Sequence, residues 1–222
     1  MELAFYWELA APYSEGCDEL LAACGEKRAA RLRRLGKERL AASLSAQLLC
    51  RTAWCTVSGL EPSAFLLEED GRGKPFVPGS SVFVSLSHSG SYAAAAAAAV
   101  PVGIDLQALR PVSPRLLTRR FNGEERAWIG AAPAENTARA IRLWTMQEAW
   151  AKLRGVGIFA GEQFHAAFRG DDLLPEGDGV RFHFPQGPEG CLLTLCLSRF
   201  TGETDTDGSF TRCLHLGRTA AE

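Results

Sequence analysis

Residues 87–107 read SHSGSYAAAAAAAVPVGIDLQ, and the conformation of the seven consecutive alanines in this stretch decides the fold. Alanine has the highest intrinsic helix propensity, which on its own favours a helix over Ala93–Ala99. However, the run has no polar face and no N-cap, and it is bounded by Ser-Gly before it and by Val100-Pro101 after it. Turn residues on both sides of a short apolar run are typical of a buried strand. We therefore expect a strand that connects an SHSG turn to a VGID segment, with a helix as the alternative.

The composition is that of an ordinary globular protein. The chain has 222 residues, of which 46% are hydrophobic and 23% charged, and its formal net charge is -2. This length allows one large domain or two of about a hundred residues each. The nearly balanced charge indicates neither nucleic-acid binding nor membrane-surface binding. The first residues resemble no signal peptide, and no apolar run approaches the roughly 20 residues that span a bilayer, so we expect a cytoplasmic protein.

The seven cysteines are at positions 17, 24, 50, 55, 191, 196 and 213. Their number is odd, and no pair has the C-x-x-C spacing of a zinc or redox site. We expect buried, reduced thiols, as in a cytosolic protein.

The order of the expected elements indicates an α+β fold. Residues 1–107 contain a strand at 1–9, two or three helices within 14–57 with a break at Gly36, and strands at 82–90, 93–99 and 102–107. The second half contains helices within 113–132 and 138–157 and strands at 180–185 and 191–200. Helices followed by strands, twice, favour two α+β halves joined near residues 100–103. We place their bounds at 1–101 and 102–222.

Four polar residues in these elements suit a magnesium ion on a phosphate-bearing substrate. Asp105 and Gln107 are two apart in an extended segment, so their side chains share a face. Glu148 and Lys152 are four apart in a helix and also share a face. Magnesium typically binds one or two carboxylates together with waters and phosphate oxygens. Taken alone, however, Glu148 and Lys152 are best explained as an exposed ion pair.

Three further features have both a structural and a functional interpretation. Glu124 and Glu125 begin a helix, where acidic residues complement the helix dipole. His88 follows a strand in a polar turn, a place from which side chains often reach a ligand. Residues 27–39 hold seven basic residues of thirteen, and such a helix is either a solvated face or a binding site for a polyanionic small molecule.

A Ser-His-Asp hydrolase built on Ser87 or Ser89 with His88 fails on geometry. Neighbouring residues of an extended segment point away from each other, and the chain has no G-x-S-x-G elbow. It also lacks a G-x-G-x-x-G motif, a Walker lysine loop and an H-E-x-x-H motif.

Five segments in order carry a resemblance to a known family: GRGKPFV (71–77), VSLSHSG (84–90), VGIDLQ (102–107), RRFNGEE (119–125) and LWTMQEAWAKLRGVG (143–157). As a set, they resemble the 4'-phosphopantetheinyl transferases of the surfactin-synthetase type, which have two fused halves. The resemblance implies a pseudo-twofold pair of similar α+β subdomains with magnesium and coenzyme A in the cleft between them. It also implies transfer of phosphopantetheine from coenzyme A to a serine of an apo acyl or peptidyl carrier protein, with release of 3',5'-ADP. In that family a strand links the SHSG and GID motifs.

The resemblance also assigns the catalytic residues. Asp105 and Glu148 would hold the metal, with Gln107 contributing through a water. Glu125 would assist the metal or activate the attacking serine, and Lys152 would neutralise the leaving phosphate. This agrees with phosphoryl-transfer chemistry, which depends mainly on alignment and charge neutralisation.

The resemblance further implies a set of coenzyme contacts. Ser87 and His88 would contact the phosphates of the nucleotide, together with Lys152, and Lys74 would lie along the coenzyme. The basic residues expected to contact the coenzyme are Arg28, Arg31 and Arg51.

Two positions depart from the family pattern. The residue at 107, often acidic in this type, is Gln107, and the lysine that usually precedes the helix glutamate is Gln147. The first change should weaken metal binding, and the second removes a cation near the phosphates. We therefore expect slower turnover or weaker coenzyme binding, which a Gln147→Lys variant would test.

Three functions follow from these observations. The first is a transferase that modifies carrier proteins of fatty acid, polyketide, nonribosomal peptide or lysine pathways and acts as a monomer. The second is a family member that binds coenzyme A or a carrier protein without transfer. The third is a magnesium-dependent phosphodiester hydrolase acting on coenzyme A.

Overall fold

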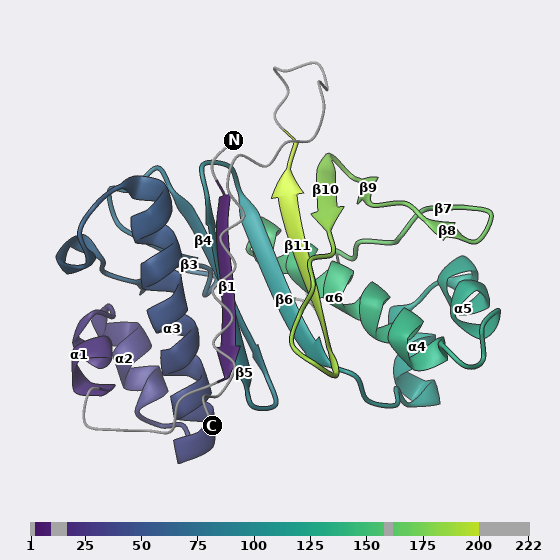
Figure 1. Cartoon of the computed structure of the whole chain (residues 1–222), viewed down its shortest axis with the longest axis horizontal. Coiled ribbons are helices and arrows are strands. Elements are labelled where there is room, and N and C mark those ends of the chain that lie inside the picture. The colour runs from purple at the N-terminus through teal and green to yellow at the C-terminus, as the bar shows by residue number, and fades with distance from the viewer. Residues whose placement is uncertain (1–2, 10–16, 158–161, 200–222) are drawn as a thin grey trace.

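The computed structural model of the chain (Figure 1) describes residues 3–9, 17–157 and 162–199. These residues form an α+β fold, as expected. Two sheets pack face to face between two long helices: α3 (Lys37–Ser58) covers one sheet and α6 (Asn136–Arg154) covers the other. Within the described ranges, no helix is both long enough and apolar enough to cross a bilayer.

The first sheet is antiparallel, with the strand order β1-β5-β4. Its strands are β1 (Leu3–Leu9), β4 (Phe83–Ser89) and β5 (Tyr92–Ala98). The shorter elements between them are α1 (Cys17–Ala22), α2 (Glu26–Leu32), η1 (Pro62–Ala64), β2 (Glu68–Glu69) and β3 (Pro75–Phe76). The expected break at Gly36 is confirmed, because this residue is the extended N-cap of α3. The basic run at 27–39 is therefore not one helix.

The second sheet has the order β6-β11-β10-β9. Its strands are β6 (Val102–Ala108), β9 (Glu176–Gly177), β10 (Val180–His183) and β11 (Cys191–Ser198). The segment 113–132 forms two helices, α4 (Pro114–Arg120) and α5 (Gly123–Gly130), because Asn122 caps α5 with its side chain. A hairpin of β7 (Phe168–Arg169) and β8 (Asp172–Leu173) and the short β9 were not expected. The described residues include neither Phe200, the end of the strand expected at 191–200, nor Cys213.

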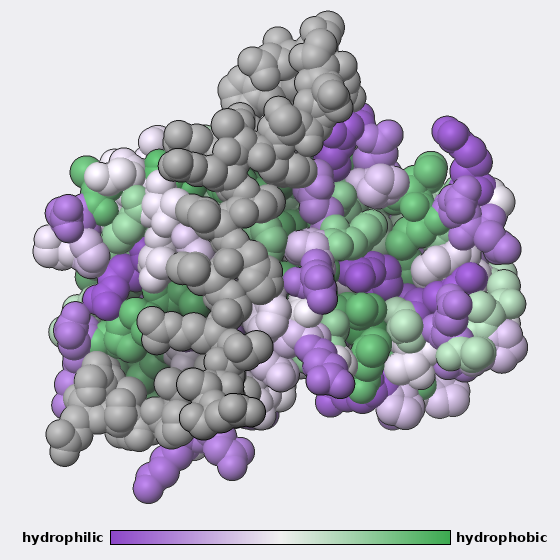
Figure 2. Space-filling model, in the orientation of Figure 1, coloured by the Kyte–Doolittle hydropathy of each residue, from purple (hydrophilic) through white to green (hydrophobic). Residues whose placement is uncertain are grey.

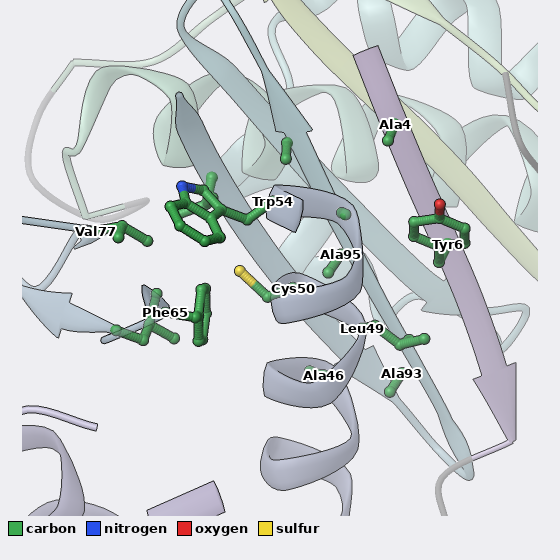
Figure 3. Packing of buried hydrophobic residues seen from close by; sticks show 14 residues of the cluster. Ala4, Tyr6, Ala46, Leu49, Cys50, Trp54, Phe65, Val77, Ala93 and Ala95 are labelled. Atoms are coloured by element: carbon green, nitrogen blue, oxygen red, sulfur yellow. The ribbon is translucent and has the colours of Figure 1, made fainter. Parts of the chain in front are cut away.

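The alanine run is a strand, and it is buried on both faces. Ala93, Ala95 and Ala97 pack against α3 (Figure 3), whereas Ala94, Ala96 and Ala98 face β6 and β11. All six are 0% exposed, and Ala99 lies in the turn that follows. Larger side chains would hold the helix and the second sheet further from β5. The alanines therefore bring three layers close together, which explains why their helix propensity does not decide the conformation.

A row of serines on β4 joins the two sheets. The Oγ atoms of Ser85, Ser87 and Ser89 accept hydrogen bonds from the backbone N–H groups of Ile104, Leu106 and Ala108, at 3.0, 3.1 and 3.0 Å. These N–H groups lie on the edge of β6 that faces away from β11. Without the serines they would be buried without a hydrogen-bond acceptor. The serine row therefore sets the register of β4 against β6.

The free thiols include those of Cys55 and Cys191, and those of Cys24, Cys50 and Cys196, which are buried. Burial raises the pKa of the Cys50 thiol to about 12. A thiol of this kind is unreactive at neutral pH, in keeping with the structural role expected from the sequence.

Candidate functional site

The helix α6 lies directly on β6, because Gly103 has no side chain. A Cβ atom at this position would be 1.9 Å from the carbonyl oxygen of Ala149. The next residue on the same face of β6 is Asp105, which is 5% exposed and therefore also lies against the helix. Opposite Asp105 on β11 is Thr194, whose hydroxyl oxygen is 2.7 Å from that of Thr145 on α6. The close approach thus creates a buried carboxylate between the strand and the helix.

Asp105 is held by residues from both sides of the sheet junction. Its Oδ1 accepts hydrogen bonds from the Ser87 hydroxyl of β4 at 2.9 Å and from the Lys152 ammonium of α6 at 2.7 Å. Its Oδ2 is buried and has no hydrogen-bond partner among the described residues. Buried carboxylate oxygens are normally paired, so an oxygen in this position is suited to a metal ion or a ligand.

Lys152 links this carboxylate to the edge of β6. Besides Asp105, its ammonium donates to the carbonyl oxygen of Ile104 at 3.0 Å. An ammonium has three N–H groups, so these two contacts leave one for an anion. The side chain is 29% exposed, which allows a ligand to reach it.

Glu148 lies one helical turn before Lys152 and adds a second carboxylate. Burial, and after it the charge of the Asp105 carboxylate, raise the pKa of Glu148 to about 7 against the opposing charges of Lys152 and Arg120. Two neighbouring carboxylates attract a cation, because it removes their repulsion. The sequence prediction that Asp105, Glu148 and Lys152 come together therefore agrees with the structure.

The donor set fits magnesium when a phosphate is also present. Gln107 follows Asp105 on the same face of β6 and is half-buried. Within the described part of the chain, no three His, Cys, Asp or Glu side chains gather as a metal site. Two carboxylates and an amide are nevertheless enough for Mg²⁺, which commonly takes its other ligands from water and phosphate.

His88 lies at the end of β4 among positive charges. Burial lowers the pKa of His88, and the charges of Lys152, Arg39 and Arg28 lower it further, with a partial offset from Asp105. A ring that is neutral at pH 7 and surrounded by cations belongs to an electropositive region, which attracts phosphates. The position of His88 beside the Asp105 site is thus compatible with the predicted phosphate contact.

The three predicted coenzyme arginines each have an acidic partner. Arg28 and Arg31 both pair with Glu69, and Arg51 pairs with Glu19 at 3.1 Å. Arg28 is 7% exposed, whereas the side chain of Arg31 is 54% exposed. Their contact with the coenzyme stays a prediction, and Arg31 is the more accessible of the pair on Glu69.

Lys74 lies at the C-terminal end of α6. Its ammonium donates to the carbonyl oxygen of Leu153, and burial lowers the pKa of Lys74. A cation at this end of a helix interacts favourably with the helix dipole. Lys74 therefore stabilises the turn that carries Lys152, and its predicted contact with the coenzyme stays untested.

Glu125 is fully buried, and its charge acts on Arg120, as that of Glu148 does. Its carboxylate accepts the backbone N–H of Asn122, which completes a capping box, and the backbone N–H of Ala166 at 2.9 Å. It also bonds to His165 Nδ1 at 3.0 Å. The structure shows no contact between Glu125 and Asp105 or Glu148, so its predicted role in catalysis stays a prediction and its evident role is structural.

Two features of the site were missed by the sequence analysis. One is the serine row, which the alternating residues of Ser85–Ser89 could have indicated. The other is Arg120, which is 2% exposed and whose charge acts on Glu148. A basic residue at the end of a short helix gave no signal that it would be buried beside the site.

Several known proteins are similar in sequence to this chain. A sequence model of the 4'-phosphopantetheinyl transferase superfamily matches residues 101–176. The chain is 27% identical over 180 residues to a 4'-phosphopantetheinyl transferase of Bacillus subtilis, which covers 79% of the chain and 78% of that protein. It is 34% identical over 121 residues to the 4'-phosphopantetheinyl transferase psf-1 of Bacillus pumilus and 33% identical over 117 residues to HetI of Nostoc, and it spans about half the length of these two relatives. The matched region contains Asp105, Glu148 and Lys152, so the candidate site lies in the part of the chain that is similar to the 4'-phosphopantetheinyl transferase superfamily.

Proposed function

We propose that the protein transfers 4'-phosphopantetheine from coenzyme A to a serine of an apo acyl or peptidyl carrier protein in the presence of Mg²⁺. The serine oxygen forms a bond to the β-phosphorus of coenzyme A, and the bond from that phosphorus to the oxygen of 3',5'-ADP breaks. The observation that carries this proposal is the arrangement around Asp105, which has a buried Oδ2 without a partner and a lysine on Oδ1. The products are the holo carrier protein and 3',5'-ADP.

The site lies where residues of the two halves meet. We propose that residues 1–101 and 102–222 are similar α+β halves related by a pseudo-twofold axis, with coenzyme A in the cleft between them. The contact of Ser87 on β4 with Asp105 on β6 supports this placement, because it brings a side chain of the first half to the centre of the second.

Asp105 and Glu148 are the residues that would hold Mg²⁺, with Gln107 acting through a water. When bound, the ion would neutralise charge on the phosphates. Lys152 donates to Asp105 and has an N–H group for the departing phosphate, so it both orients the carboxylate and offsets developing negative charge. Glu125 accepts three hydrogen bonds, two on Oε2 and one on Oε1, so Oε1 has an acceptor site left for the proton of the serine.

The coenzyme is expected to lie along the electropositive side of the site. We expect His88, Lys152 and Arg31 to contact its phosphates, and Arg28, Arg51 and Lys74 to be further coenzyme contacts. Ser87 has a single hydroxyl proton, which it donates to Asp105. A phosphate contact by Ser87 would therefore require this hydrogen bond to break.

The carrier protein needs a surface near the same site. Figure 2 shows hydrophobic and hydrophilic residues interspersed over the part of the surface formed by α4 and α5. Partly buried apolar side chains of this part include Leu117 and Trp128. We propose that the carrier docks here, and that a cytoplasmic monomer suffices because one chain supplies both halves of the cleft.

The test is intact-mass measurement of an apo acyl carrier protein incubated with the protein, coenzyme A and Mg²⁺. Addition of one phosphopantetheinyl group is expected, and Asp105→Asn should abolish it. Asp172→Asn is the matched control, because this exposed aspartate of β8 lies outside the site.

The other outcomes identify the alternatives. Coenzyme A binding without transfer to any of several carrier proteins would support a binding protein. It would also indicate that Gln107 and Gln147 account for the loss of transfer. Release of phosphopantetheine in the absence of a carrier would support the phosphodiester hydrolase.

A further inference from the structure

Arg120 is the last residue of α4, and its side chain lies against α6 instead of in solvent. The residue is 2% exposed. Its Nη2 donates to Gln147 Oε1 at 3.2 Å, and Gln147 Nε2 donates back to the Arg120 carbonyl oxygen at 3.2 Å. Gln147 is also 2% exposed, so these two hydrogen bonds form a closed pair between the helices.

The arginine is placed beside Glu148. Its Cζ lies 5.6 Å from the ring centroid of Trp144. Trp144, Gln147 and Glu148 occupy positions i, i+3 and i+4 of α6, which are neighbours on one helix face. Contact with the first two therefore locates the guanidinium next to the third, and the effect of its charge on Glu148 supports this placement.

We propose that Arg120, held by Gln147, is a positioning residue that supplies a fixed positive charge beside Glu148, in addition to that of Lys152. A guanidinium keeps its proton throughout the physiological range, so the charge is permanent. Because Arg120 is buried and held, it needs no reorganisation when the coenzyme phosphates arrive. It acts through Glu148 and does not touch the substrate. The inference rests on the proposed function, because that function identifies coenzyme A as the substrate. It also revises the expectation that the site lacks a cation because Gln147 replaces the usual lysine.

The experiment compares variants that remove or move this charge. Arg120→Leu with Gln147→Leu replaces both side chains by apolar groups, so of this pair only the backbone carbonyl oxygen of residue 120 loses its hydrogen bond. This double variant should stay folded and bind coenzyme A in the presence of Mg²⁺ about tenfold more weakly in a calorimetric titration, with a similar loss in transfer rate. Arg120→Gln with Gln147→Lys moves the charge to α6 and should recover affinity to within about threefold.

Two single variants complete the set. Arg115→Gln removes one charge from the exposed side of α4 and is expected to bind coenzyme A like the wild type. Gln147→Lys alone would bury two cations together, so it should melt at a lower temperature without binding coenzyme A more tightly.

Several results would overturn the inference. One is wild-type coenzyme affinity in the folded apolar double variant, and another is equal loss in the apolar and charge-moved variants when both are folded. If the apolar variant does not fold, a gain in affinity by Gln147→Lys without loss of stability would also contradict it. Absence of transfer by the wild type would contradict the proposed function alone, because the coenzyme titration still decides the role of Arg120.

Discussion

The hydroxyl of Ser87 donates to Asp105 Oδ1 at 2.9 Å and accepts the backbone N–H of Leu106 at 3.1 Å. One side chain of β4 therefore orients the candidate metal ligand and pairs the open edge of the neighbouring sheet. Its neighbour Ser85 makes the second kind of contact, with Ile104, but no contact with Asp105 is found for it. Both serines therefore help to join β4 to β6, but only Ser87 also orients Asp105.

Ser87→Ala and Ser85→Ala should lose similar amounts of stability but differ in activity. Each leaves one buried N–H without its acceptor, which costs about 1–3 kcal/mol in the free energy of unfolding. Only Ser87→Ala also frees Asp105, so it alone should raise the Mg²⁺ concentration needed for half-maximal transfer. Urea unfolding and a Mg²⁺ titration of the transfer rate measure the two effects. Equal Mg²⁺ dependence in both variants would show that Ser87 has no role in orienting the carboxylate.

Gly103→Ala should be strongly destabilising. The new Cβ would meet the carbonyl oxygen of Ala149 at 1.9 Å, and two backbones can separate only by moving α6 away from β6. We expect a loss of about 3 kcal/mol or more in the free energy of unfolding. Gly130→Ala is the control, because no atom lies within 4 Å of its added Cβ and alanine favours the helix by about 0.5–1 kcal/mol. A Gly103→Ala protein as stable as the wild type would contradict the close approach of α6.

The fold shows which sequence signals were sufficient. Alternation in residues 82–90 and the turn residues around the alanines predicted β4 and β5 correctly, because burial on both faces overrides the helix propensity of alanine. The helix expected to begin at Glu124 and Glu125 is confirmed as α5, which begins at Gly123 and is capped by the side chain of Asn122. The short β7, β8 and β9 carry too few residues for a periodic pattern to be recognised.

The site could be predicted in part. Period two in β6 and period 3.6 in α6 give the faces of Asp105 and Glu148, and the resemblance brings the two elements together. The contact of Lys152 with Asp105 is in accord with this prediction. The burial of Arg120 and the binding of Glu125 to His165 and Ala166 could not be predicted, because both depend on how distant segments pack.

Glu125→Gln distinguishes a structural role of this residue from a catalytic one. The amide keeps one acceptor oxygen, so one of the contacts to Asn122, His165 and Ala166 must be lost. We expect a loss of about 1–3 kcal/mol in the free energy of unfolding and a transfer rate that stays close to that of the wild type below the melting temperature. Glu124→Gln, on the exposed neighbour, should change neither quantity. A stable Glu125→Gln protein with a large loss of turnover would instead support the role as activator of the serine.

The carboxyl of Glu148 should make the stability of the metal-free protein depend on pH. Its pKa is about 7 in the folded protein, because of burial and the Asp105 carboxylate, and 4.5 is its ordinary value. Between these values the folded state keeps a proton that the unfolded state has released, so this group's contribution to stability is complete below pH 4.5 and is lost as the pH rises through 7. Glu148→Gln does not titrate there. The melting temperature of the variant in EDTA should therefore rise relative to the wild type from pH 5 to pH 8.

At pH 8, Mg²⁺ should raise the melting temperature of the wild type more than that of Glu148→Gln. At pH 8 the wild type has both carboxylates charged, and a bound cation relieves their repulsion, so Mg²⁺ is expected to raise its melting temperature. Glu148→Gln lacks one of these ligands and should respond less, while Glu162→Gln, at an exposed position outside the site, should respond like the wild type. Differential scanning fluorimetry over a Mg²⁺ series measures the shifts. An equal response of all three proteins to Mg²⁺ would mean that the ion binds elsewhere. In the pH series in EDTA, a constant difference in melting temperature between Glu148→Gln and the wild type would mean that the pKa of the Glu148 carboxyl is not shifted.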